Sequence, residues 1–244
     1  MRIAHLSDLH IDSSKGEIYG VKPYENLLKT ISLLESYKDI DLAVITGDIS
    51  NDGCRFSYLL ADRAFAHIGF PVYILNGNHD NTQELFETAF SKFKYEPVFS
   101  QGEIDFISVN TVAVAEDGKN RSRGVLPEWE LGRIKSIIAE GERKKIILMH
   151  HPATETGSWI DRRILENRQL FINSVSSSDK VIAVLSGHNH YATNERIGNC
   201  LYCTAPSVST SFDKDLAPFE EAFQPGFNIL TIEGERCNVE TVRL

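Results

Sequence analysis

Eight side chains that can bind a metal ion or move a proton lie in five short clusters along the chain. They are Asp8, His10, Asp48, Asn78, His79, His150, His188 and His190. Each cluster follows directly on a short apolar run that is typical of a buried strand. In open α/β sheets ligands bind where the strands end, so polar side chains at such ends are candidates for chemistry. We therefore expect the five clusters to meet in one site.

The donor atoms in these clusters are imidazole nitrogens and carboxylate or amide oxygens, with no thiolate. Such a set suits manganese, iron or zinc, and it has too many ligands for one four-coordinate ion. Two metal ions fit the number, and Asp48 is the natural bridge because its carboxylate has two oxygens. Two adjacent ions promote in-line displacement at phosphorus by turning a bound water into hydroxide. His79 is not needed as a ligand, and we expect it to stabilise phosphoryl charge or to protonate the leaving oxygen.

Each cluster taken alone has a simpler interpretation. Capping groups and polar turns account for most single Asp and His residues after a strand. Five clusters at five predicted strand ends are harder to explain in this way. The other three histidines, His5, His67 and His151, are interpreted as structural, although either His150 or His151 could be the ligand in their cluster.

The apolar pattern predicts strands that alternate with helices in the first half of the chain and a strand-rich second half. The main predicted strands are 2–7, 42–46, 71–75, 104–110, 145–149, 181–186 and 199–204, and the main predicted helices are 23–38, 57–66, 128–140 and 161–175. This order favours an α/β (α+β) fold, a four-layer αββα sandwich of two mixed β-sheets flanked by helices, with the metal site at the strand ends. We expect residues 1–244 to form a single domain.

Composition excludes several classes of function. Lys and Arg number 25 against 34 Asp and Glu, and this net charge of -9 argues against a partner of duplex nucleic acid. We expect no membrane partner and a cytoplasmic location, because we find neither a signal peptide nor a membrane-spanning apolar run. Cys200 and Cys203 have zinc-site spacing, but residues three apart on a strand face opposite ways, so we interpret them as buried thiols.

The sequence resembles the calcineurin-like metallophosphoesterases, whose motifs Asp-x-His, Gly-Asp, Gly-Asn-His-Asp, His and Gly-His-x-His recur here in that order. The corresponding residues are Asp8 to His10, Gly47-Asp48, Gly77 to Asp80, His150 and Gly187 to His190. The resemblance implies one metal held by Asp8, His10, Asp48 and His190, and a second held by Asp48, Asn78, His150 and His188. It also implies that His79 is the catalytic histidine.

Within that family the sequence is similar to class III cyclic nucleotide phosphodiesterases and to glycerophosphodiesterases. The further stretches that carry this likeness are His150-His151-Pro152, Trp159-Ile160-Asp161 with Asn167, Ala205-Pro206-Ser207 to Phe212, and Pro225-Gly226-Phe227. Two positions depart from the pattern, because Asn76 and Ala153 stand where relatives often have proline. Neither is a ligand, so the departures bear on the subfamily and not on the chemistry.

The expected function is that of a dinuclear metal-dependent phosphodiester hydrolase acting on a small substrate, with a 3′,5′-cyclic nucleotide as the first choice. Trp159, Asn167 and Phe212 are the candidates for contact with its organic part. A glycerophosphodiesterase or a broad-specificity phosphomonoesterase is the alternative among enzymes. A protein-binding scaffold of the same fold is the non-enzymatic alternative, although all eight site positions are filled here. Homo-oligomer formation stays open.

Overall fold

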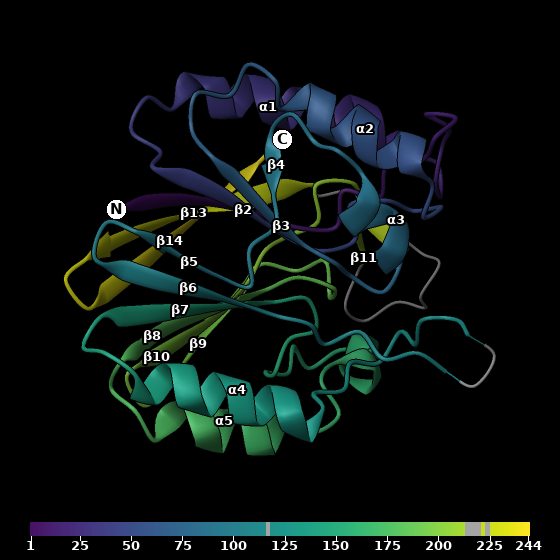
Figure 1. The fold of residues 1–244 in the computed structure, drawn as a ribbon. Coiled ribbons are helices and arrows are strands. Elements are labelled where there is room, and N and C mark those ends of the chain that lie inside the picture. The colour runs from purple at the N-terminus through teal and green to yellow at the C-terminus, as the bar shows by residue number, and fades with distance from the viewer. Residues whose placement is uncertain (116–117, 213–220, 223–224) are drawn as a thin grey trace.

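Two six-stranded sheets lie face to face at the centre of the fold, and helices cover their outer faces (Figure 1). The computed structural model describes residues 1–115, 118–212, 221–222 and 225–244, without the side chains of 211, 212, 221 and 222. The layers run helix, sheet, sheet, helix, which confirms the predicted αββα sandwich of two mixed sheets.

The first sheet has four parallel strands and two antiparallel strands along one edge. In spatial order its strands are β14 (Arg236–Arg243), β13 (Gly226–Glu233), β1 (Arg2–Leu6), β2 (Leu42–Thr46), β3 (Val72–Leu75) and β4 (Phe93–Lys94). Its outer face is covered by α1 (Pro23–Ser36) and α2 (Arg55–Ala64), and α3 (Thr82–Glu87) follows β3.

The second sheet has four parallel strands between two antiparallel edge strands. In spatial order its strands are β5 (Val98–Gln101), β6 (Ile104–Val109), β7 (Lys144–Met149), β8 (Val181–Ser186), β10 (Cys200–Thr204) and β9 (Thr193–Ile197). Its outer face is covered by α4 (Glu128–Ala139) and α5 (Arg168–Ser176). A small hairpin joins β11 (Ser211–Phe212) and β12 (Glu221–Ala222).

Three apolar cores separate the four layers, and alternate residues of each central strand enter different cores. In β2, Leu42 and Val44 face the second sheet, whereas Ala43 and Ile45 face the helices. Burial on both faces explains the nearly continuous apolar runs that make these strands recognisable in the sequence. The same alternation sends Cys200 and Cys203 into different cores, as the strand spacing predicts.

One predicted helix is interrupted. The expected helix over 161–175 is a 3₁₀ helix, η1 (Trp159–Arg163), followed by a break and then α5. Within the break, the backbone N–H groups of Leu165 and Glu166 donate to Pro152 O and Gly124 O at 3.0 and 2.8 Å. Because these donors bond to other segments, they cannot continue the helical ladder, and the prediction of one continuous helix is wrong.

Candidate metal centre

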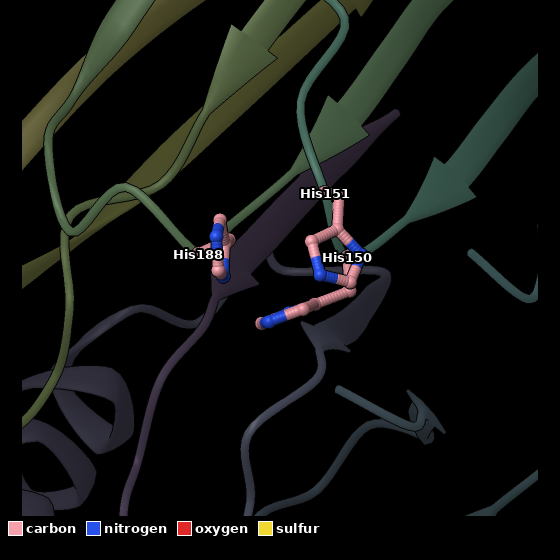
Figure 2. A group of neighbouring side chains, drawn as sticks. All are labelled: His150, His151 and His188. Atoms are coloured by element: carbon pink, nitrogen blue, oxygen red, sulfur yellow. The ribbon is translucent and has the colours of Figure 1, made fainter. Parts of the chain in front are cut away.

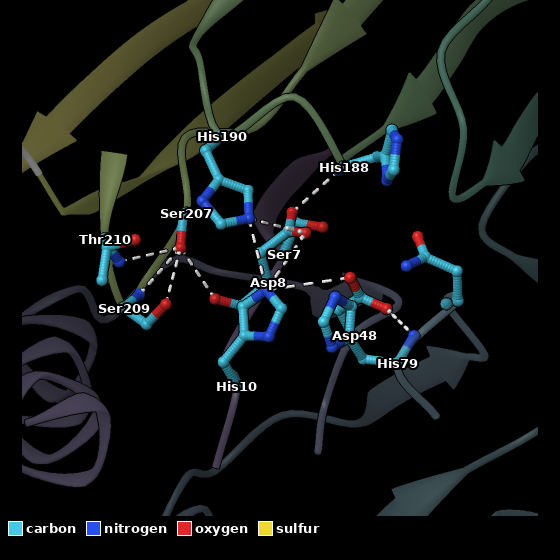
Figure 3. A network of polar contacts seen from close by, with 12 residues as sticks. Ser7, Asp8, His10, Asp48, His79, His188, His190, Ser207, Ser209 and Thr210 are labelled. Carbon is cyan, nitrogen blue, oxygen red and sulfur yellow. Dashed lines mark hydrogen bonds and ion pairs between the residues drawn. The ribbon is translucent and has the colours of Figure 1, made fainter. Parts of the chain in front are cut away.

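The five clusters meet at one edge of the sandwich, where parallel strands of both sheets end. Asp8 and His10 follow β1, Asp48 follows β2, and Asn78 and His79 follow β3, whereas His150 follows β7 and His188 and His190 follow β8. Figure 3 shows six of them, Asp8, His10, Asp48, His79, His188 and His190, close together. Six of the eight side chains line a pocket of about 370 Å³, namely His10, Asp48, Asn78, His79, His188 and His190. The structure thus brings all eight predicted residues to one edge.

A first set of donor atoms comes from Asp8, His10 and His190. The Nε2 atoms of His10 and His190 lie 3.2 Å apart, and they lie 3.8 and 3.3 Å from Asp8 Oδ1. Two ligands of one tetrahedral ion, each about 2.1 Å from it, are separated by roughly 3.4 Å. The three atoms are therefore spaced as ligands of one ion.

A second set of donor atoms surrounds Asp48. His150 Nε2 lies 3.3 Å from Asp48 Oδ2 and 3.1 Å from Asn78 Oδ1. The same Asp48 oxygen lies 3.7 Å from His10 Nε2, so this carboxylate stands between the two sets. Its other oxygen accepts a hydrogen bond of 2.8 Å from the backbone N–H of His79.

His150 and His151 lie side by side near His188 (Figure 2), and their hydrogen bonds distinguish them. His150 Nδ1 donates to Thr46 O at 2.7 Å, which leaves Nε2 free to bind a metal between Asp48 and Asn78. His151 instead contacts Thr111 Oγ1 through Nδ1 at 2.8 Å, and it is as fully buried as His150. These contacts favour His150 as the ligand in the cluster.

Burial and neighbouring imidazoles hold two histidines of the site, His10 and His188, in the neutral form. Burial, reinforced by neighbouring imidazoles, lowers the pKa of His10 to about 3 and holds the pKa of His188 well below its ordinary value. Burial also acts against a charged His150, but Asp48 and then Asp8 outweigh it and raise the pKa of His150 to about 9. The surrounding histidines keep the pKa of Asp48 low against the effect of burial. Neutral imidazoles and ionised carboxylates are the forms that bind metal ions.

Orphaned polar atoms support a metal in this site. Among the residues that the structure describes, Asp8 Oδ1 and His188 Nε2 are buried and lack a hydrogen-bond partner. A buried charged oxygen without a partner is costly, and a cation beside it would remove that cost. The combination of carboxylate, amide and imidazole donors fits manganese, iron or zinc.

Close backbone approaches hold the clusters together. A Cβ atom on Gly187 would lie 2.7 Å from Asp8 Oδ2, so a side chain at this position would collide with Asp8. The carboxylate of Asp80 accepts backbone hydrogen bonds from Gly77, Ser50 and Ile49 at 2.8, 2.9 and 3.2 Å. Asp80 therefore ties the turn after β3 to the segment that follows Asp48.

The three residues predicted to contact substrate have different positions. Trp159, the first residue of η1, lines the pocket, and η1 carries none of the proposed metal ligands. The amide of Asn167 exchanges hydrogen bonds of 3.0 and 2.7 Å with the backbone of Leu126, and Asn167 is not among the residues that line the pocket. Phe212 lies in β11, and its side chain is outside the described part of the structure.

Sequence reasoning missed other residues around the pocket. Arg162 and Arg163 line it, as do Ser122 and Thr210 from distant segments. Ser207 connects the site to the 209–210 segment, since its hydroxyl donates to Asp8 O at 2.8 Å and accepts from the backbone N–H groups of Ser209 and Thr210 (Figure 3). The signal that could have been used is the pair of adjacent arginines that follows Trp159 by three and four residues, since Trp159 was already a candidate for the pocket.

The family model of the calcineurin-like phosphoesterases matches residues 1–192. The chain belongs to this family, which uses a dinuclear metal centre, and it is a metal-dependent phosphoester hydrolase. In residues 1–115, 118–212, 221–222 and 225–244 the structure contains no helix that is long and apolar enough to span a membrane.

Named relatives agree with this assignment. A probable cyclic nucleotide phosphodiesterase from Vesicomyosocius okutanii is 31% identical over 232 residues, which are 94% of this chain and 93% of the relative. A 3′,5′-cyclic-nucleotide phosphodiesterase from Nostoc is 26% identical and covers 94% of this chain and 87% of its own length. The fold is similar to that of a dimetal phosphatase from Danio rerio, with a TM-score of 0.69 and 12% identity over 100% of this chain and 96% of the other.

Proposed function

We propose that this chain is a phosphodiesterase that hydrolyses 3′,5′-cyclic nucleotides. The observation that carries the proposal is the meeting of two sets of metal-binding atoms at a pocket whose wall includes Trp159. Metal ions held by these atoms would bind a phosphoryl group, and an aromatic ring in the same pocket offers a face on which a nucleoside base can stack. The names of the relatives support the same substrate class.

In this proposal Asp8, His10 and His190 hold one metal ion, and Asn78, His150 and His188 hold the other. Asp48 would contribute a ligand to both ions, because its carboxylate lies between the two sets. The ions, drawn from manganese, iron and zinc, supply Lewis-acid activation of the phosphoryl group and of water when bound.

The remaining chemistry belongs to residues of the chain. His150 is oriented by its hydrogen bond to Thr46 O, and His188 by the bond from its backbone N–H to Asp8 Oδ2 at 2.9 Å. His79 is exposed in the pocket, with its ring 4.8 Å from that of His10. From this position its imidazole can protonate the leaving oxygen or stabilise phosphoryl charge.

The test compares purified protein, first stripped of metal by a chelator and then reloaded with manganese. Rates are measured on 3′,5′-cyclic AMP, a glycerophosphodiester and a simple phosphomonoester. We expect kcat/KM to be highest for the cyclic nucleotide, by about tenfold or more, and to collapse without metal. A higher value for the glycerophosphodiester or the monoester would replace the proposed substrate by that class.

The His79→Ala variant tests the histidine separately. We expect kcat for cyclic AMP to fall by roughly 100-fold, since general acid-base groups contribute about 10²- to 10⁴-fold. Two metals should remain bound, as measured by elemental analysis, whereas loss of metal would make His79 a ligand instead. His67→Ala is the matched control, because His67 is also exposed but lies outside the pocket.

A further inference from the structure

A loop of two paired segments connects β6 to α4 and contacts the turn after β3. We call its described residues, 110–115 and 118–125, the clamp loop. Backbone hydrogen bonds pair its two segments. The N–H groups of Arg121, Ala115 and Val125 donate to Ala113 O, Lys119 O and Thr111 O at 2.7, 2.8 and 3.0 Å, respectively. Figure 1 shows the loop extending beyond the ends of the strands, on the side of the molecule where the site lies.

The clamp loop is hydrogen-bonded to the turn that carries His79. Asn120 Nδ2 donates to Asn78 O at 3.1 Å and to Asp80 O at 2.8 Å, and these are the carbonyl groups on either side of His79. A primary amide has two N–H donors, so one side chain can hold both carbonyls at once. At the base of the loop, Asn110 Oδ1 accepts from Asn76 Nδ2 at 3.2 Å, so the loop also holds the residue before Gly77.

The His79 imidazole depends on the main chain that bears it. Its side chain is exposed, and in the described residues no hydrogen bond to another side chain or to the backbone holds its ring. The position of the ring is therefore set by the conformation of residues 78 to 80. A general acid or charge-stabilising group loses much of its effect when it is displaced by about 1 Å.

We propose that Asn120 is a positioning residue, which holds the Asn78-His79-Asp80 turn so that the His79 imidazole points at the reacting phosphodiester. The inference rests on the proposed function, because it needs His79 to act in catalysis. The positioning role differs from a purely structural role, in which Asn120 would stabilise the clamp loop and leave the rate contribution of His79 unaffected.

A double-mutant cycle separates the two roles. Asn120→Ala, His79→Ala and the double variant are compared on cyclic AMP, with kcat, KM and bound metal measured for each. We expect Asn120→Ala to lower kcat by about tenfold while KM and the two metals are unchanged, and to cause no further loss once His79 is absent. The Asn120→Asp side chain has nearly the same shape, but its carboxylate cannot donate hydrogen bonds to Asn78 O and Asp80 O. We expect this variant to lose as much kcat as Asn120→Ala, and it replaces the alanine variant in the cycle if that variant does not fold.

Independent losses that multiply in the double variant would overturn the inference, as would full activity of Asn120→Asp. Asn194→Ala is the control, because Asn194 is exposed on β9 and away from the pocket. Failure of the proposed function is distinguishable, since wild-type protein would then prefer another phosphoester. The same cycle would be measured on that substrate.

Discussion

Replacing Gly77 with alanine should disable the site although Gly77 contributes no ligand. Gly77 follows β3, and its backbone N–H donates to Asp80 Oδ2 at 2.8 Å. A Cβ atom at this position would lie 2.8 Å from Asp48 Cγ, and closer still to the Oδ1 and backbone nitrogen of Asp48. Because a backbone atom is involved, rotating a flexible side chain cannot relieve the collision.

The size of the effect follows from these distances. Carbon atoms in contact are roughly 3.5 Å apart, so Asp48 or the Gly77 turn must move by about 0.7 Å to clear Cγ and by about 1 Å to clear the backbone nitrogen at 2.4 Å. A catalytic site tolerates displacements of about 0.5 Å, and a displacement of about 1 Å costs on the order of 100-fold in rate. We therefore expect Gly77→Ala to lower kcat/KM by about 100-fold. Overpacking should also lower the free energy of unfolding by about 1–3 kcal/mol.

The assay combines steady-state kinetics on a phosphodiester with elemental analysis and urea unfolding. Gly132→Ala is the matched control, since Gly132 is exposed in α4 and a Cβ there would meet nothing within 4 Å. It should keep full activity and gain about 0.5–1 kcal/mol, because alanine is the better helix former. If Gly77→Ala keeps two metals and a rate within about twofold of wild type, the argued crowding around Asp48 is wrong.

Two further predictions concern stability. The buried Asp62 carboxylate accepts backbone hydrogen bonds from residues 91, 92 and 93, so Asp62→Ala should lower the free energy of unfolding by about 3 kcal/mol, and a loss below about 1 kcal/mol in urea would contradict this. Partial burial raises the pKa of Asp52, but hydrogen bonds from Ser57 and Ser13 outweigh it, so the pKa lies below its ordinary 3.8. Because folded Asp52 binds its proton more weakly than the unfolded chain does, its contribution is complete above about pH 5 and is lost as the pH falls. The difference in urea midpoint between wild type and Asp52→Asn should narrow below about pH 4, and a difference that is equal at all pH values would refute the assignment.

The sheets were predictable because their central strands are buried on both faces. Apolar runs such as Leu42–Thr46 and Val181–Ser186 were found with their bounds correct to the residue. Polar residues that follow such runs in parallel strands must gather at one edge, so the approximate position of the site was also predictable. The face-to-face packing of the two sheets was predicted as well, but the order of the strands within each sheet was not, because the pairing of β1 with the distant β13 is not reported by any local pattern.

The walls of the pocket could not be predicted in the same way. Ser122 and Thr210 come from irregular segments, which have no periodicity that would report their direction, and Arg163 ends the short 3₁₀ helix η1. Asn167 is a residue that sequence reasoning assigned to the pocket although its amide bonds elsewhere. Its partner is the backbone of Leu126, a residue 41 positions earlier that no sequence pattern associates with it. The donor role of Asn120 is hidden for the same reason, because its partners lie about 40 residues away.

Backbone conformation at the site shows why local rules fail there. Of the seven non-glycine residues with positive φ in the described chain, five are proposed ligands, namely Asp8, His10, Asp48, His188 and His190. Left-handed conformations favour glycine, and each such residue costs of order 1 kcal/mol, so a sequence chosen for stability alone would place glycine or asparagine there. Carboxylate and imidazole groups occupy these positions because the tight turns aim their donor atoms at common points. The strain is therefore a signature of the metal centre, and it should be partly offset when metal binds and stabilises the folded chain.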